Sequence, residues 1–135
     1  GVDYIEFVVN YGKRLEGVKS RCGSIDAFVR RAEDFPSLVA QEGLAAALTF
    51  YYSKAEGKDV RPEDVKDCGE ITPEGKGYSL YLNFLIETLR TFRDLKCEKP
   101  LDCILEVRRN EFALTRLILP ILIEMKKVAH IIEGE

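Results

Sequence analysis

Acidic side chains that could bind a metal ion are concentrated in one stretch of the sequence, residues 56–75. Seven acids stand there against three bases, which gives the stretch a local charge of −4. Four of the carboxylates follow one another at spacings of three and four residues: Asp64, Asp67, Glu70 and Glu74. On a helix this spacing would align oxygen ligands of the kind that Mg²⁺ prefers. Gly69 and Pro73 disfavour that helix, so we interpret the stretch as a solvated acidic loop and expect no metal ion or other cofactor.

Familiar motifs of enzyme active sites are missing from the sequence. None of the motifs for binding phosphate groups or dinucleotides, for zinc-dependent proteolysis or for a nucleophilic serine is present. The single histidine, His130, has no evident partner with which to act as a general base. We therefore expect a protein that is not an enzyme. A carboxylate-dependent all-α hydrolase acting on nucleotides stays as an alternative, and it would require the acidic stretch to be helical and concave.

Four cysteines are too widely spaced to form a recognisable zinc site, because no two of them make a C-x-x-C pair. We favour free, mostly buried thiols. The alternative is a disulfide between Cys97 and Cys103 across Pro100. The sequence has few amide side chains and many Lys and Glu residues, a balance typical of thermophiles, which keep some intracellular disulfides.

Basic side chains could contact nucleic acid, although the net charge of the chain is −3. The acidic stretch accounts for −4, so the rest of the chain carries +1 and can still present a basic face. The candidates for nucleic-acid binding are Arg30, Arg31, Lys54, Lys126 and Lys127. The alternative is a set of solvated helix faces with local partners, such as Asp26 for Arg30. Such a protein would be an adaptor between proteins, without a nucleic-acid role.

Apolar residues at helical spacing predict the elements that position these side chains in the N-terminal half. The first helix has a buried stripe made of Tyr4, Val8, Tyr11, Leu15 and Val18. Ser24 is expected to cap a second helix by accepting a backbone N–H. Pro36 is expected to end that helix and to open another one. Gly43 is expected at a sharp corner, where it ends a helix in a left-handed conformation that only glycine adopts at low cost, before a helix that ends near Gly57.

A long loop and three further helices are predicted for the C-terminal half. Four glycines and two prolines make residues 57–77 a loop. A helix then follows around residues 82–92, and Pro100 opens a shorter one. The last helix, about residues 111–132, is apolar nearly all round and should be kinked by Pro120. No strand pattern is present, so we predict an all-α fold, with residues 1–135 forming a single compact bundle of about six helices.

No segment of the sequence is typical of a membrane span or a secretory signal. The apolar run near the C-terminus, residues 117–123, is only seven residues long. This is far below the ~20 residues that a membrane-spanning helix needs. The sequence does not open with a charged segment followed by an apolar stretch and a cleavage site of small residues, the pattern of a secretory signal. We therefore expect a cytoplasmic protein without a membrane partner.

Two stretches of the sequence resemble the small helical subunit of type III-B (Cmr) CRISPR effector complexes. Residues 30–54 match the central signature of that family: a helix leading into Leu-Pro (here Phe35-Pro36), a polar-Gly-Leu corner at Gly43, and a small-residue helix closing on Ser53-Lys54. Residues 111–129 resemble the family's last helix, with the basic pair Lys126-Lys127 ahead of a final apolar turn. Together the matches cover about a third of the chain.

The resemblance implies an all-helical subunit without catalytic activity that serves in antiviral defence. In such ribonucleoprotein complexes, copies of the small subunit line up beside the backbone subunits that hold the guide RNA. They help to form the channel for the guide and target RNA, while other subunits cleave the target. The partners implied are other Cmr subunits, guide and target RNA, and neighbouring copies of the same subunit.

Overall fold

The computed structural model describes residues 3–73 and 75–135, and over these residues the fold is all-α, as predicted. The helices are α1 (Tyr4–Cys22), α2 (Asp26–Glu42), α3 (Leu44–Lys54), α4 (Tyr78–Arg93), α5 (Pro100–Arg109) and α6 (Glu111–Gly134). The described part of the predicted loop holds only two short 3-10 turns, η1 (Pro62–Asp64) and η2 (Cys68–Glu70). None of these helices is long and apolar enough to cross a membrane.

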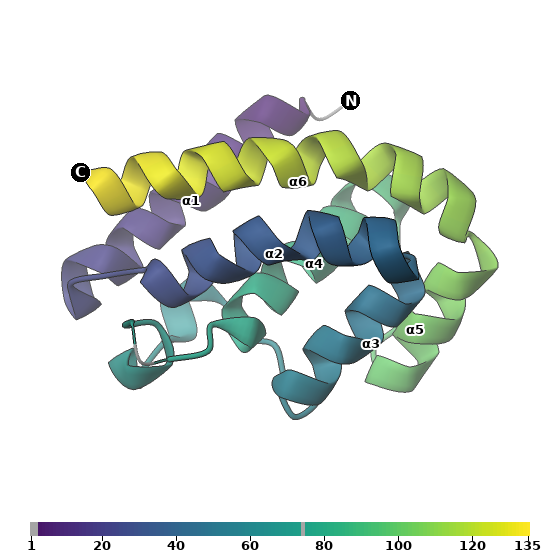
Figure 1. Cartoon of the computed structure of the whole chain (residues 1–135), viewed down its shortest axis with the longest axis horizontal. Helices are drawn as coiled ribbons and strands as arrows, with labels where there is room; N and C mark the ends of the chain where they lie inside the picture. The colour runs from purple at the N-terminus through teal and green to yellow at the C-terminus, as the bar shows by residue number, and fades with distance from the viewer. Residues whose placement is uncertain (1–2, 74) are drawn as a thin grey trace.

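The longest helix, α6, lies along one edge of the molecule and packs against both α1 and α2 (Figure 1). α1 crosses behind α6, while α3 and α5 pack together at one end (Figure 1). Residues at a spacing of three and four in α1 face the core, because Val8, Tyr11, Leu15 and Val18 are all buried as predicted. Tyr4 is the exception: it is 38% exposed at the start of the helix.

Helix α4 runs through the centre and is buried on nearly all sides. Its residue Tyr81 has no exposed surface and lies with ring centroids 5.2–5.9 Å from four other aromatic rings. These rings belong to Phe28, Phe35, Tyr51 and Phe84. Burial raises the pKa of Tyr81 well above 10. The aromatic centre therefore joins α2, α3 and α4 into one core.

The two ends of α6 each supply a carboxylate to the N-terminus of another helix. Glu111 accepts the backbone N–H of Ala45 in the first turn of α3, at 3.1 Å. At the other end, Glu133 accepts the N–H of Ile25, just before α2, at 2.8 Å. Free N–H groups and a partial positive charge mark a helix N-terminus, so both carboxylates stabilise the helices that they meet.

The prediction that Pro36 separates two helices is wrong, because α2 continues through it. Proline removes one backbone donor, but Phe35 and Val39 on either side are buried in the core and hold the helix together. Packing has therefore overridden the local preference of Pro36 for ending a helix.

At the start of α2, Ser24 does accept the N–H of Asp26, at 2.9 Å, as expected.

The corner at Gly43 is confirmed, and its φ is positive at 91°. Its ψ of 159° differs from the left-handed helical conformation that was expected and lies in a region that is essentially restricted to glycine. Its N–H still closes α2 by donating to Val39 O, at 2.9 Å. A Cβ atom at Gly43 would lie 2.6 Å from Glu111 Oε1. The corner therefore needs glycine for its backbone, and the Glu111 side chain of α6 would have to shift to admit a Cβ atom.

Free thiols, our favoured interpretation, are wrong because all four cysteines are in disulfides. The alternative, a Cys97–Cys103 bridge, is present and closes the segment that leads into α5. A second bridge, Cys22–Cys68, was not predicted, and it fastens η2 to the end of α1. The two sulfurs of this pair meet only because the chain folds back over a sequence separation of 46 residues.

Candidate nucleic-acid interface

The two arginines of α2 already have partners within the fold. Arg30 forms an ion pair with Asp26 at 3.3 Å, as predicted, and donates hydrogen bonds to the carbonyls of Pro73 and Gly75. Arg31 pairs with Asp34 at 3.2 Å. Its side chain is only 15% exposed. Arg30 thus holds the chain ahead of α4 against α2, and Arg31 offers little surface to a ligand.

An aromatic cluster brings Arg31 and Lys54 together from separate helices. The Arg31 guanidinium lies 4.4 Å from the centre of the Tyr78 ring. Tyr78 meets the edge of Phe50 at 6.2 Å between ring centroids. The Lys54 ammonium lies 5.4 Å from the centre of the Phe50 ring. Cations on aromatic faces keep their charge available, so Lys54 stays an exposed positive group.

The remaining candidates, Lys126 and Lys127, lie on α6 and differ in their surroundings. Lys127 is 2.8 Å from Glu124, and the hydrogen bond to this carboxylate raises the pKa of Lys127. Lys126 is exposed and forms no ion pair within the described residues. One turn further on, His130 lies 2.6 Å from Glu33 of α2, so the histidine does have a partner that the sequence did not reveal.

Four of the five candidates lie in two groups: Arg31 and Lys54 on one side of α2, and Lys126 and Lys127 on α6. Arg31 and Glu33 lie on opposite flanks of this helix, because two residues turn an α-helix by about 200°. Glu33 faces α6 through His130, whereas Arg31 faces α4 through Tyr78. Lys54 therefore belongs with Arg31, and Lys126 lies on the α6 side. Whether one nucleic acid spans both groups stays a prediction.

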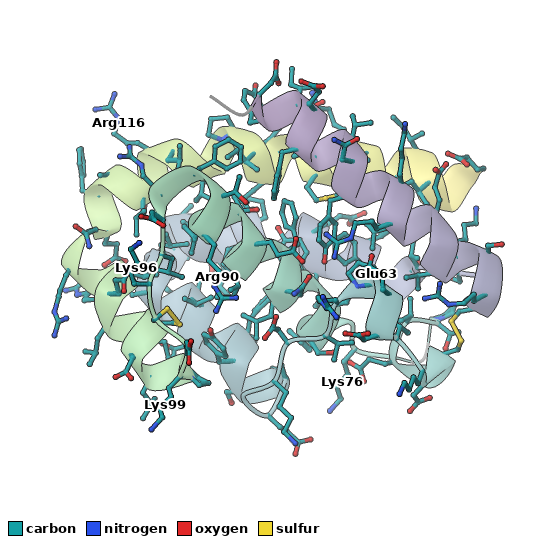
Figure 2. The ribbon with its side chains drawn as sticks, turned by 180° about the vertical axis from the view of Figure 1, so that it is seen from behind. Glu63, Lys76, Arg90, Lys96, Lys99 and Arg116 are labelled. Carbon is teal, nitrogen blue, oxygen red and sulfur yellow. A yellow bond between two sulfur atoms is a disulfide. The ribbon has the colours of Figure 1, made fainter. Side chains whose placement is uncertain are left out.

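Most carboxylates of the acidic stretch take part in contacts within the fold. Glu63 in η1 accepts two hydrogen bonds from Arg14 of α1, at 2.6 and 2.8 Å, and Figure 2 shows its position beneath α1. These bonds lower the pKa of Glu63. Asp59 accepts a hydrogen bond from the Asn83 side-chain N–H, at 2.8 Å. The side-chain oxygen of Asn83 in turn accepts a hydrogen bond from the Tyr11 hydroxyl. The stretch is thus fastened to α1 and α4, which a purely solvated loop would not be.

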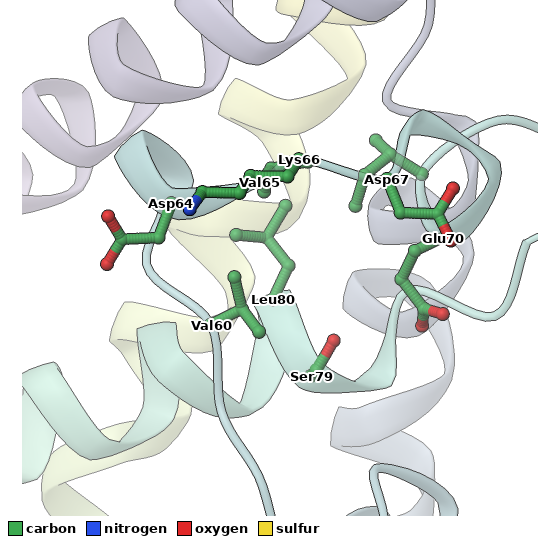
Figure 3. A pocket seen from close by; sticks show the side chains of 9 residues that line it. Val60, Asp64, Val65, Lys66, Asp67, Glu70, Ser79 and Leu80 are labelled. Atoms are coloured by element: carbon green, nitrogen blue, oxygen red, sulfur yellow. The ribbon is translucent and has the colours of Figure 1, made fainter.

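The candidate metal ligands line a small pocket of about 220 Å³ with an apolar floor (Figure 3). Asp64 points away from Asp67 and Glu70, which lie on the other side of the pocket. Asp67 accepts the N–H of Gly69, and Asp64 pairs with Arg61. Glu74, the fourth member of the predicted set, lies outside the described residues. Over residues 3–73 and 75–135, no three metal-binding side chains converge.

Sequence reasoning missed an exposed aromatic side chain at the junction of α5 and α6. Phe112 is 79% exposed, more than any other large hydrophobic side chain in the described chain. Three arginines surround it: Arg108, Arg109 and Arg116. We name this surface, made of Phe112 and the three arginines, the α5–α6 corner. A signal was present in the sequence, because an aromatic residue stands among bases at spacings of three and four.

These features define a small all-α protein with exposed bases on several helices. A family model described as CRISPR-associated protein (Cas_Cmr5) matches residues 11–132. The chain therefore belongs to the Cas_Cmr5 family and is a CRISPR-associated Cmr subunit, with other Cmr subunits as its partners. This confirms the resemblance noted in residues 30–54. No curated protein and no solved structure gives a significant match.

Proposed function

We propose that this Cmr subunit is a structural component, not an enzyme, of a type III-B complex that targets RNA with a guide RNA. In this role it lines the channel of the guide and target RNA with a basic face, beside neighbouring copies of itself, in the cytoplasm. The alternative is a helical adaptor that contacts only proteins.

Two exposed lysines carry the proposal. Lys54 and Lys126 form no ion pair with the described residues, whereas Arg30, Arg31 and Lys127 do. An unpaired ammonium group can exchange its counterions for a phosphate without first breaking a salt bridge. Since the chain as a whole carries −3, we expect the isolated subunit to bind short RNA weakly.

A salt titration of the assembled complex tests the proposal. The variant is Lys54→Ala with Lys126→Ala, and it omits Arg31 because this side chain packs on Tyr78. The affinity of the complex for target RNA should fall. The slope of log affinity against log salt should flatten by up to about two units, since each lost phosphate contact contributes roughly 0.7–0.9.

The matched control replaces two other exposed lysines, Lys13 in α1 and Lys99 ahead of α5, with alanine. It removes the same charge, so an equal loss in both variants would indicate only a general charge effect. If the Lys54 and Lys126 variant is incorporated normally and keeps the wild-type slope, the adaptor alternative is favoured.

A further inference from the structure

The α5–α6 corner combines an exposed ring with positive charge that the fold does not use. Phe112 belongs to the first turn of α6, yet it contributes almost nothing to the core. The guanidinium of Arg116 lies 5.9 Å from the centre of its ring. Since Phe112 remains 79% exposed, most of the ring surface stays open to solvent. Burial against a ligand would remove this apolar surface from water.

Only one of the three arginines of the corner has an acidic partner among the described residues. Arg108 pairs with Glu111, and the same carboxylate also accepts the N–H of Ala45. Arg109 and Arg116 form no ion pair with residues 3–73 or 75–135. Arg116 extends away from the body of the protein (Figure 2). The corner thus carries net positive charge on a protein whose total charge is −3.

The shape of the corner suits a chain of linked anionic units. A shallow groove of about 730 Å³ runs over the junction, and its lining includes Arg108, Arg109, Phe112 and Arg116. The groove is open, so it can receive a segment of a polymer from the side. Arginines on both sides of the ring can then contact successive charges of such a polymer.

We propose that the α5–α6 corner binds an unpaired nucleotide segment of RNA, with a base stacked on Phe112 and phosphates held by Arg109 and Arg116. Single-stranded nucleic acid offers both features at once, because each base has a flat face and each linkage has a charge. A duplex buries its base faces and leaves the ring without a partner. An acidic peptide would neutralise the arginines but has no comparable flat face. This inference rests on the proposed RNA-facing role and names a different surface from Lys54 and Lys126.

The first test measures where RNA touches the subunit in the assembled complex. Target RNA carries 5-iodouridine, which crosslinks to aromatic side chains on irradiation, either in the guide-paired segment or in the unpaired flanks. We expect crosslinks at Phe112 from the unpaired positions and none from the paired segment. An incorporated subunit that never crosslinks at Phe112 overturns the inference.

The second test measures the affinity of the isolated subunit for a 12-nucleotide uridine RNA at low salt. Phe112→Leu keeps an exposed apolar side chain but removes the stacking face, and we expect roughly 5- to 100-fold weaker binding. Phe112→Trp should restore binding. The control is Leu101→Ala, which changes another strongly exposed side chain, 75% exposed, on α5 and should leave the affinity unchanged.

The outcomes separate this inference from the proposed function. If Phe112→Leu binds RNA as wild type does while the Lys54 and Lys126 variant is impaired in the complex, the corner is not an RNA site and the proposed function stands. If neither variant is impaired, both fail. If Phe112→Leu only prevents incorporation into the complex, the corner docks a protein, and the inference is wrong.

Discussion

Replacing Gly43 with alanine should destabilise the protein through two separate effects at the corner between α2 and α3. The first is backbone strain, because φ of 91° with ψ of 159° is costly for any residue with a Cβ atom. The second is a collision, since the new Cβ would lie 2.6 Å from Glu111 Oε1. Glu111 would have to move and would give up its hydrogen bond to Ala45.

The expected loss of unfolding free energy is the sum of the two effects. Strain at such a position costs ~1–3 kcal/mol, and loss of a carboxylate from a helix N-terminus costs ~1 kcal/mol. The total is then roughly 2–4 kcal/mol. For a chain of 135 residues, each kcal/mol lowers Tm by about 3–4 °C. Gly43→Ala should therefore lower Tm by about 6–16 °C.

A matched glycine separates strain from collision. Gly23 also has a positive φ, 84°, but a Cβ there would meet no atom within 4 Å. Gly23→Ala should cost only the ~1–2 kcal/mol of a left-handed backbone. The assay is thermal unfolding followed by circular dichroism, with urea titration for the free energies. If Gly43→Ala melts at the wild-type temperature, or no lower than Gly23→Ala, the reasoning about the corner is refuted.

Two further predictions concern the acidic stretch and the disulfides. The hydrogen bonds from Arg14 lower the pKa of Glu63 below its ordinary value of 4.5. The ionised carboxylate therefore stabilises the fold fully above pH 4.5, and this stability is lost as the pH falls through the lowered pKa. Tm measured from pH 7 to pH 3 should thus fall less steeply for Glu63→Gln, and parallel curves would contradict this. Replacing both cysteines of the Cys22–Cys68 bridge with serine should lower the free energy of unfolding by up to about 4 kcal/mol. The same change at Cys97–Cys103 should lower it by up to about 2 kcal/mol. The reason is that a bridge closing 46 residues restricts the unfolded chain more than a bridge closing six. Urea titration of both double variants checks the order, and a larger loss from the shorter bridge would overturn it.

The sequence by itself determined the all-α class and most helix positions, because helical periodicity is a local property. Val8, Tyr11 and Leu15 recur every three or four residues, and the structure buries all three. Gly43 also follows from local rules, since a φ near 90° with an extended ψ is costly for any residue that carries a Cβ atom. The match of residues 30–54 to the Cmr small subunit was visible for the same reason: it depends on spacing along the chain.

Only the tertiary structure decided the features that depend on packing or on contacts between residues far apart in the sequence. Pro36 stays inside α2 because its neighbours are buried in the core, which outweighs the loss of one backbone donor. Cys22 meets Cys68 only after the chain has folded back on itself. The basic residues of the candidate site were also predictable only in part. The types of the basic residues were readable in the sequence, but their partners were not, because an ion pair depends on distances between helices. That is why only the folded structure showed that, among the five candidates, Lys54 and Lys126 are exposed and form no ion pair with the described residues.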